Sequence, residues 1–542
     1  MDAPGTTHRL RSWKAIASYL GCSVRTARRW EADEDMPVHR LMHKSQGSVY
    51  AYPHELDGWL NRDERRESAT GESRTDERRS IAVLPFEFIG ADAESAYIAD
   101  GFTDEVIADL AKIRTLRVTS RTSSMSLKGT QQPMRKIARS LDVGLLLEGS
   151  VQKQGANLRI AVRLIDADSE DTLWTEKYPA VLDEVFAVQE RIARDVAAEL
   201  EVSLSGDDEA RLETRDVDDV GAWLLATQAK QESFRWRPDA IDRAVQLLEK
   251  AIDSAGERPA LISALGRAWL QYREAGADLG PEPIERAKDC ARRIAAVDPD
   301  AAVGLQLSGW IHYAEGNIRN AVRDLNAAIE ADVNDADSMN LLTNCYLISG
   351  RVSLARSLTE RVMKLDPLTP VARCLPGWAD SLEGKFEAAV GPYREMFEMD
   401  PGNPIARLFL LWSLVSAGRN EEALALAEGF GSETENTLPG QVARLYVAAL
   451  RGETIEGDGG LSDHVEAVAN TSDVIPRLLA QAYALCGQTS LAIVWLGRAV
   501  ERGFINYPYL ARHDPLFASI RNEPGFQAIL RDVEQRWERF DA

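Results

Sequence analysis

The chain has 542 residues, of which 63 are lysine or arginine and 85 are aspartate or glutamate, so its formal net charge is −22. This length exceeds one ordinary core and predicts about three domains, while the acidic charge repels phosphates and excludes a general nucleic-acid coat. No apolar run approaches the roughly 18 residues of a membrane helix, and residues 1–20 lack the apolar core of a signal peptide.

The distribution of cysteine and charge adds two expectations. Five cysteines lie far apart, at positions 22, 290, 345, 374 and 486, without a CxxC pair. This scatter predicts reduced thiols and a cytoplasmic protein. Residues 1–62 hold nine basic and seven acidic side chains, a net of +2, which leaves −24 for the remainder. One small domain can therefore bind DNA although the whole chain is acidic.

Residues 1–62 predict a helix, a tight turn and a second helix, followed by a β-hairpin. In SWKAIASYLGCSVRTARRW, Ser12 and Ser23 can cap the two helices and Gly21 supplies the turn. Two β-prone runs flank the turn SQGS in MPVHRLMHKSQGSVYAY, which indicates the hairpin. The short helix PHELDGWLNRD closes the domain. This order of elements is typical of a winged helix.

The second predicted helix carries Arg25, Arg28 and Arg29, whose spacing places them on one side. A guanidinium group can hold a phosphate or a guanine edge through two hydrogen bonds, so this side can face DNA. The alternative is a solvated surface helix. The acidic cluster EADED at 31–35 favours that alternative, because anions are disfavoured at a helix C-terminus.

The segment SWKAIASYLGCSVRTARRWEADEDMPVHR resembles the DNA-binding domain of MerR-type and excisionase-like winged-helix proteins. The resemblance implies that the second helix reads the major groove of double-stranded DNA and that the wing contacts the backbone. The residues expected to bind DNA are Ser23, Arg25, Thr26, Arg28, Arg29, Arg40, His43 and Lys44. No metal site is expected, because histidines at 39 and 43 need not converge on a hairpin. A homodimer is compatible with such a domain, although no heptad run indicates one.

Residues 63–79 belong to the charged stretch NRDERRESATGESRTDERRS, which predicts a solvated linker. Residues 80–203 then predict a domain of the α+β class with a mixed sheet. SIAVLPF and LRVTS predict strands, and SAYIADGFTDEVIADLAKI and MRKIARSLDV predict helices. GLLLEGSVQKQGANLRIAVRLIDADSEDTLWTEKY predicts a three-stranded meander, and the helix LDEVFAVQERIARDVAAEL ends the domain.

The stretches IAVLPF, ADGFTDEV, LRVTSRTSS, ARSLDVGLLLEGSV and VRLIDADSEDTLWTEKY resemble the TolB amino-terminal-like domain. In bacterial proteins that domain often lies between a signalling or DNA-binding domain and helical repeats, and the resemblance implies no catalytic role. The segment TSRTSS at 119–124 gathers hydroxyl groups around Arg121. They either face a ligand or, as is more common at a strand end, bond to the local backbone.

Residues 204–542 predict an all-helical array, because residues of one type recur every 34 positions. The recurring alanines are Ala287, Ala321, Ala355, Ala389 and Ala423. The recurring glycines and aspartates are Gly316, Gly350, Gly384, Gly418, Asp298, Asp332, Asp366 and Asp400. Small residues let paired helices approach each other, glycine ends one helix and proline begins the next.

This pattern resembles the tetratricopeptide repeat (TPR), most clearly across residues 302–430, and predicts about eight helical pairs with the cap GFQAILRDVEQRWERF. A TPR superhelix has a concave groove that binds a protein or peptide. The residues expected to line this groove are Gln306, Trp310, Tyr313, Asn340, Asn344, Trp378, Leu408 and Trp412. The alternative is that the tryptophans pack between adjacent repeats.

No GxSxG, GxxxxGK[ST] or HExxH motif and no glycine-rich dinucleotide turn occurs, so we expect neither an enzyme nor a cofactor. The predicted chain combines a winged helix, an α+β domain and a TPR superhelix, and no membrane segment. We expect a cytoplasmic DNA-binding transcriptional regulator whose last two domains receive a protein or small-ligand signal. The alternative is a TPR scaffold in which the winged helix is a protein-interaction module.

Overall fold

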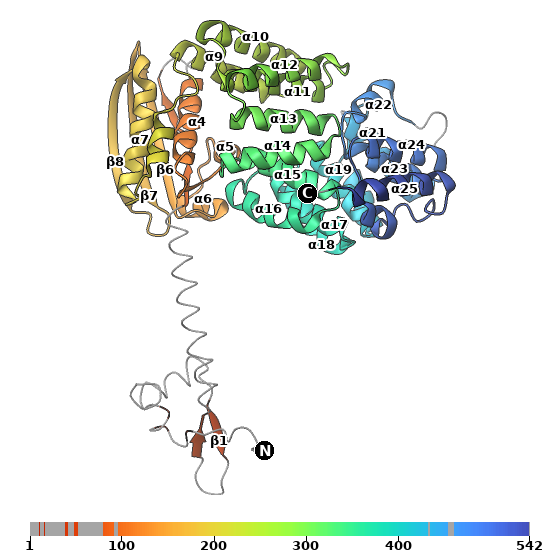
Figure 1. The fold of residues 1–542 in the computed structure, drawn as a ribbon. Coiled ribbons are helices and arrows are strands. Elements are labelled where there is room, and N and C mark those ends of the chain that lie inside the picture. The colour runs from red at the N-terminus through yellow and green to blue at the C-terminus, as the bar shows by residue number, and fades with distance from the viewer. Residues whose placement is uncertain are drawn as a thin grey trace, which may run out of the picture. The chain divides into compact units, whose positions relative to one another are not determined.

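The chain divides into two compact units, Met1–Arg78 and Arg79–Ala542. The computed structural model describes residues 10, 13, 16, 38–41, 48–51, 80–90, 96–431, 434–453 and 460–540 (Figure 1).

The described part of the first unit contains a two-stranded antiparallel sheet. Strand β1 (His39–Leu41) pairs with β2 (Ser48–Tyr50), which confirms the expected hairpin. Leu10 and Ala51 exchange two backbone hydrogen bonds, and Ile16 is helical and fully buried. Of the predicted DNA-binding residues, those that lie outside the described residues are Ser23, Arg25, Thr26, Arg28, Arg29, His43 and Lys44. Arg40 lies on β1, opposite Val49.

The second unit begins with a six-stranded sheet, and the sequence predicts its mixed character. Its strands are β3 (Ser80–Val83), β4 (Glu87–Ile89), β5 (Arg117–Val118), β6 (Leu145–Gln154), β7 (Asn157–Asp166) and β8 (Thr172–Val181). The order is β5-β3-β6-β7-β8, with β4 beside the second half of β6. β3 is parallel to β5 and β6, whereas β6, β7 and β8 form the expected antiparallel meander.

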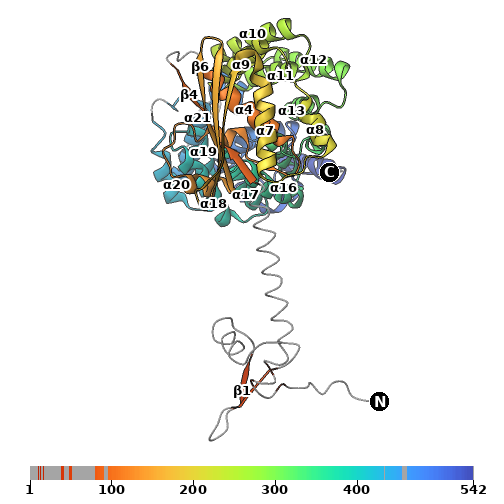
Figure 2. The ribbon, with the colours of Figure 1, turned by 90° about the vertical axis from the view of Figure 1, so that its left-hand side faces the viewer.

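Helices cover the two faces of this sheet and bury alternate residues of each inner strand. Helices α4 (Tyr97–Ala111) and α7 (Val185–Glu199) lie beside the strands in Figure 2 and share one core with Ile81 and Val83. Helix α6 (Met134–Leu141) packs on the opposite face with Ala82. The sequence did not predict the short strand β4 or the short helix α5 (Arg121–Met125). Helix α8 (Gly206–Glu213) follows this middle domain.

Within the described part of the chain, eight consecutive pairs of helices follow, as the 34-residue period predicts (Figure 1). The pairs are α9 (Val220–Ser233) with α10 (Pro238–Ala255), α11 (Pro259–Glu274) with α12 (Glu282–Val297), α13 (Ala302–Ala314) with α14 (Ile318–Ala331), α15 (Ala336–Ile348) with α16 (Val352–Leu365), α17 (Pro370–Leu382) with α18 (Phe386–Met399), α19 (Pro404–Ser416) with α20 (Asn420–Ala427), α21 (Leu438–Arg451) with α22 (Asp463–Ala469), and α23 (Ile475–Leu485) with α24 (Thr489–Glu501). The π-helix Tyr509–His513 and the predicted cap, α25 (Pro524–Glu538), complete the array.

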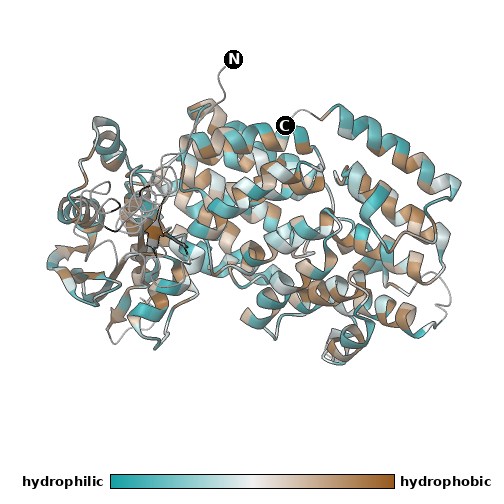
Figure 3. Ribbon diagram, turned by 90° about the horizontal axis from the view of Figure 1, so that it is seen from below, coloured by the Kyte–Doolittle hydropathy of each residue, from teal (hydrophilic) through white to brown (hydrophobic). Residues whose placement is uncertain are grey.

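Small residues set the close packing of paired helices. Ala321, Ala355 and Ala389 are all buried, and an added Cβ at Gly309 would lie 2.7 Å from Leu325 of the partner helix. Most helices also carry one apolar and one polar side, visible in Figure 3 as bands of brown and teal. The apolar sides bury one continuous core from Ile318 to the cap.

Two consecutive turns of the array contact the middle domain. Asp366, which follows α16, is only 5% exposed and accepts hydrogen bonds from the hydroxyl groups of Ser120 and Ser123, the latter at 2.7 Å. One repeat earlier, the side-chain amide of Asn334 donates to the carbonyl of Ala111 at 3.0 Å. Both contacts replace water at polar groups with protein partners, so they join the two domains specifically.

These contacts settle the role of the segment TSRTSS in the described structure. Ser120 caps α5 by accepting a hydrogen bond from the backbone N–H of Ser123 at 3.1 Å, which is the expected local bond. The same hydroxyls also reach Asp366, and Arg121 pairs with Asp104. The hydroxyls thus bind the repeat array, an arrangement that neither interpretation of the sequence included.

We predict that Asp366→Ala lowers the free energy of unfolding by about 1.5–3 kcal/mol, because it removes a charged acceptor from buried hydroxyl groups. Asp400→Ala is the matched control, since Asp400 holds the same repeat position one period later and is exposed. Urea unfolding of the full chain measures both variants. An equal loss of stability in the two would contradict the docking role of Asp366.

Candidate functional site

The C-terminal segment of the chain lies against the first helices of the central repeats, where the sequence predicts a groove. The backbone N–H of Ile505 donates to the carbonyl of Ile348 at 3.0 Å, and the Asn506 amide donates to the carbonyl of Leu347 at the same distance. Both acceptors belong to α15. Residues that follow α24 therefore lie against the C-terminal end of α15.

Trp412 and Leu408 lie on α19. Trp412 is 1% exposed, and its indole N–H donates to the Gln481 side chain of α23 at 2.9 Å. Tyr393 packs edge-on against its ring at 5.6 Å between centroids. Leu408 is also buried. Contrary to the expectation, both side chains belong to the core of the array, where Trp412 contacts Gln481 of the last helical pair.

A buried cation holds this region together. The guanidinium group of Arg477 lies over the rings of Trp412, Phe504 and Tyr509, at 4.9, 5.2 and 5.7 Å from their centroids. The aromatic faces attract the cation where water cannot reach it. The carboxylate of Asp514 is also buried and accepts a hydrogen bond from Gln481 at 2.7 Å. Burial raises the pKa of the Asp514 carboxyl.

The recurring turn glycines explain how the C-terminal segment approaches so closely. Gly316, Gly350 and Gly384 all have left-handed φ angles, of 75°, 75° and 81°. A Cβ at Gly316 would lie 2.5 Å from the carbonyl oxygen of Glu501, one at Gly350 2.8 Å from Trp537, and one at Gly384 2.9 Å from His513. The glycines thus end their helices and leave space for the segment.

Other predicted groove residues are occupied by contacts within the chain. The Gln306 amide donates to the carboxylate of Asp335 at 2.8 Å and accepts from Arg267, whose guanidinium lies 5.3 Å from the ring centroid of Trp310. Trp310, Trp378 and Asn340 are partly buried. The indole nitrogens of both tryptophans are buried without an acceptor. Their N–H groups are therefore not accessible to the backbone of a bound peptide in this structure.

Tyr313 and Asn344 lie at a pocket. The Asn344 amide donates to the Tyr313 hydroxyl at 2.5 Å, and that hydroxyl is hydrogen-bonded to Asp473. Burial raises the pKa of Tyr313 well above its usual value, so the hydroxyl stays protonated and donates to the carboxylate. The two predicted residues are thus brought together with a third that spacing alone does not identify.

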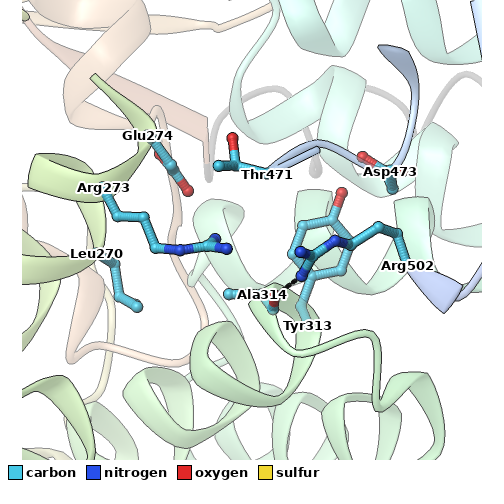
Figure 4. A pocket seen from close by; sticks show the side chains of 8 residues that line it. All are labelled: Leu270, Arg273, Glu274, Tyr313, Ala314, Thr471, Asp473 and Arg502. Atoms are coloured by element: carbon cyan, nitrogen blue, oxygen red, sulfur yellow. Dashed lines mark hydrogen bonds between the residues drawn. The ribbon is translucent and has the colours of Figure 1, made fainter. Parts of the chain in front are cut away.

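The pocket lies between α11, α13, the loop from α22 to α23, and the end of α24 (Figure 4). Its volume, including the open mouth, is about 390 Å³. The residues that line it are Leu270, Arg273, Glu274, Tyr313, Ala314, Thr471, Asp473 and Arg502. In the α11–α12 loop, a Cβ added at Gly276 would lie 3.3 Å from Val468 of α22, so an early and a late part of the array meet here.

Two arginines of the pocket are not neutralised by carboxylates. Arg273 is 7% exposed, its Nε has no acceptor, and its guanidinium group points into the pocket in Figure 4. Arg502 donates to the carbonyl of Ala314 at 3.3 Å. Neither forms an ion pair with a described residue. Burial, followed by the charge of Arg502, lowers the pKa of Arg273, and the charge of the neighbouring Glu274 opposes this shift.

Two carboxyl groups complete the pocket. Asp473 is 9% exposed, and its Oδ2 is buried without a donor. Glu274 reaches solvent but is surrounded by protein on several sides, and this enclosure raises the pKa of its carboxyl to about 7. The pocket therefore offers cationic donors on one side and an acceptor on the other.

Sequence analysis missed Arg273, Asp473 and Arg502. Neither Arg273 nor Asp473 has an identical residue 34 positions away, and all three come from repeats in which the period is weak. The local signal in the sequence is that Arg273 and Glu274 stand at the end of a predicted helix, shortly before the turn glycine Gly276. A pair such as Arg273 and Arg502 becomes apparent only in three dimensions.

Within the described residues, neither a cluster of metal ligands nor a membrane-spanning helix is found, and four thiols are free. No group of three histidine, cysteine, aspartate or glutamate side chains is arranged to hold a metal ion. No helix is long and apolar enough to cross a membrane. The cysteines at 290, 345, 374 and 486 are free thiols. Burial raises the pKa of Cys290 to about 11 and that of Cys374 to about 12, so both are unreactive as nucleophiles.

Comparison with known proteins relates the middle domain to regulators. Residues 77–195 match the family described as the second domain of HilA/YgeH-like transcriptional regulators. A curated protein of Rhizobium meliloti (strain 1021), named putative adenylate cyclase 3, is 36% identical over 174 residues. That match covers 32% of this chain and only 30% of the relative.

Solved structures of TPR proteins resemble the array. TTC0263 from Thermus thermophilus covers 36% of this chain at 16% identity and a TM-score of 0.31, with 99% of its own chain aligned. A TPR protein from Parabacteroides merdae ATCC 43184 covers 59% at 10% identity and a TM-score of 0.33, with 100% of its own chain aligned. YrrB, described as a TPR protein with an unusual peptide-binding site, covers 36% at 18% identity and a TM-score of 0.27, with 97% of its own chain aligned.

We predict that Trp412→Ala lowers the free energy of unfolding by about 3–5 kcal/mol, because it empties a fully buried site and leaves Gln481 without its donor. Trp310→Ala and Trp378→Ala should have smaller effects, since both rings are partly buried. Trp236→Ala is the control, because Trp236 is 56% exposed and its loss should change stability by no more than about 0.5 kcal/mol. Thermal and urea unfolding of the four variants test this order.

Proposed function

We propose that this protein is a DNA-binding transcriptional regulator in which the N-terminal domain contacts DNA and the docked middle domain and repeat array receive a signal. The observation that carries the proposal is the match of residues 77–195 to a domain of transcriptional regulators. The predicted winged helix directly precedes that domain, and the arginines at 25, 28 and 29 supply the chemistry that a major groove requires.

The contacts between the middle domain and the array support a shared role in signalling. The hydrogen bonds to Asp366 and from Asn334 attach the middle domain to two successive repeats. Arg117 adds a third contact by donating to the carbonyl of Lys364 at 2.8 Å. A ligand or protein that changes the spacing of these repeats would therefore change the contacts of the middle domain as well.

Genome-wide mapping of the sites occupied by the full-length protein tests the proposal. The regulator should occupy discrete sites, and the triple variant Arg25→Ala, Arg28→Ala, Arg29→Ala should lose them. Arg292→Ala is a control, because Arg292 is an exposed arginine of α12 that belongs to the repeat array. If the triple variant keeps the wild-type sites, or if the wild type occupies none, the scaffold alternative replaces the regulator.

We predict two different effects on DNA binding by the purified full chain. Arg28→Ala should weaken binding to the mapped sequence by about 1–3 kcal/mol, because it removes a contact to base edges. Lys44→Ala should weaken all sequences alike and reduce the salt dependence by about one phosphate contact. Titrations of specific and unrelated duplexes at several salt concentrations distinguish the two effects.

The cyclase name of the relative calls for a separate test. Since the match covers only 30% of that protein, we propose that the shared segment is a non-catalytic module and that this chain does not form cyclic AMP. Incubation of the purified chain with ATP and Mg²⁺ or Mn²⁺, followed by measurement of cyclic AMP, tests this directly. Formation of product above a heat-denatured control would contradict it.

A further inference from the structure

We propose that the pocket around Arg273 and Arg502 is a binding site for a small anion, with the two guanidinium groups holding a phosphate or carboxylate group of the ligand. The pocket combines two converging cations with an unpaired buried acceptor, and no sequence motif or relative assigns a site to it. The proposal concerns the small-ligand form of the signal that the proposed function requires.

The first argument is that the charges of the pocket are incomplete without a ligand. Arg273 is buried, yet no described carboxylate lies within ion-pair distance of it or of Arg502. Buried charges in proteins are normally paired or bound to an ion, because water is absent. The partly exposed Arg356 pairs with Asp380 at 2.6 Å and with Glu383 at 2.7 Å, and the buried Arg477 lies over three aromatic rings. Among the described residues, Arg273 has neither kind of partner.

The second argument is the unpaired oxygen of Asp473, which lines the same pocket. One side of this carboxylate is fixed by the Tyr313 hydroxyl, while Oδ2 has no donor. Buried polar atoms without a partner are rare in native proteins and commonly mark the place of a missing ligand or water. An anion with a hydroxyl or amino group near its charged end would satisfy both the arginines and Asp473.

The geometry selects a compact ligand. The volume of about 390 Å³ counts open solvent at the mouth, so the enclosed space suits a small anion and excludes a folded partner. Planar guanidinium groups bind oxyanions through parallel hydrogen bonds, which suits a phosphate or a carboxylate equally. The whole chain carries a large negative charge, which would attract a basic partner, whereas the two arginines make this pocket locally positive.

The position of the pocket gives binding a structural consequence. Arg273 belongs to the second pair of helices, Tyr313 to the third, and Asp473 and Arg502 to the last two. An anion between the two arginines removes their mutual repulsion and so stabilises the contact between the first and last parts of the array. Binding therefore favours the closed array, in which the C-terminal segment covers the inner face.

The test uses the full-length protein and two probes, inorganic phosphate and acetate, added at constant ionic strength with chloride as the reference. Thermal unfolding should show a saturable rise in melting temperature with at least one probe. Arg273→Met and Arg502→Met should weaken that response at least about tenfold, because each removes a charge-assisted hydrogen bond. The control Arg292→Met, on the exposed side of α12, should respond like the wild type.

A second readout separates a ligand site from a structural role of Arg273. In chloride alone, Arg273→Met should melt at the same temperature as the wild type or above it, since methionine keeps much of the apolar stem and removes a repelled cation. If Arg273→Met does not fold, Arg502→Met, at a partly exposed position, carries the same test. A response to phosphate but not acetate identifies a phosphate-bearing ligand, and the reverse identifies a carboxylate.

Two results would overturn the proposal: no response of the wild type to either probe beyond that to chloride, or an equal response of the wild type and both methionine variants. Neither result depends on DNA. If the protein binds the anion but occupies no genomic site, the anion site stands and the proposed regulator function is wrong. If it occupies genomic sites but does not bind the anion, the regulator function stands and the anion site is wrong.

Discussion

The hydrogen bond from the indole of Trp412 to Gln481 joins residues that are 69 positions apart. The packing of α23 against α19 that this bond fixes is the contact on which the closure of the array depends. The inner face of a helical repeat array is the concave surface that such proteins use for binding. Here the chain covers it, with Arg477 held between three aromatic rings and Asp514 bonded to Gln481. A partner that used this face would have to displace a well-packed core.

The same closure organises the other features of the second unit. Because the last repeats return to the second and third pairs, Arg502 and Asp473 reach Arg273 and Tyr313 and form a pocket that no single repeat contains. The turns that contain Asn334 and Asp366, which follow the third and fourth helical pairs, carry the middle domain. Ligand pocket and regulator-like domain thus share the helices between them, which is the arrangement that the proposed signal requires.

Local patterns predicted most of the secondary structure. Alternation identified β6, β7 and β8, and the 34-residue period identified the helical pairs. The turns between these strands contain Gly155 and Glu170 at positive φ angles. The period could not predict that Trp412 is buried, because its burial depends on Gln481 in a distant repeat. It also could not reveal Arg273 with Arg502, since charge pairs between irregular repeats have no spacing rule. The predicted DNA contacts remain predictions from the residues alone.

The turn glycines also bear on how such a chain can evolve. Repeat arrays whose members touch only their neighbours can gain or lose whole copies by unequal recombination, because each new copy meets the same surroundings. Here Gly316, Gly350 and Gly384 meet three different parts of one C-terminal segment, at Glu501, Trp537 and His513. Deleting or duplicating any copy between them would bring the wrong turn to each contact. The copy number of these repeats is therefore fixed by the fold, and divergence must proceed by substitution within copies.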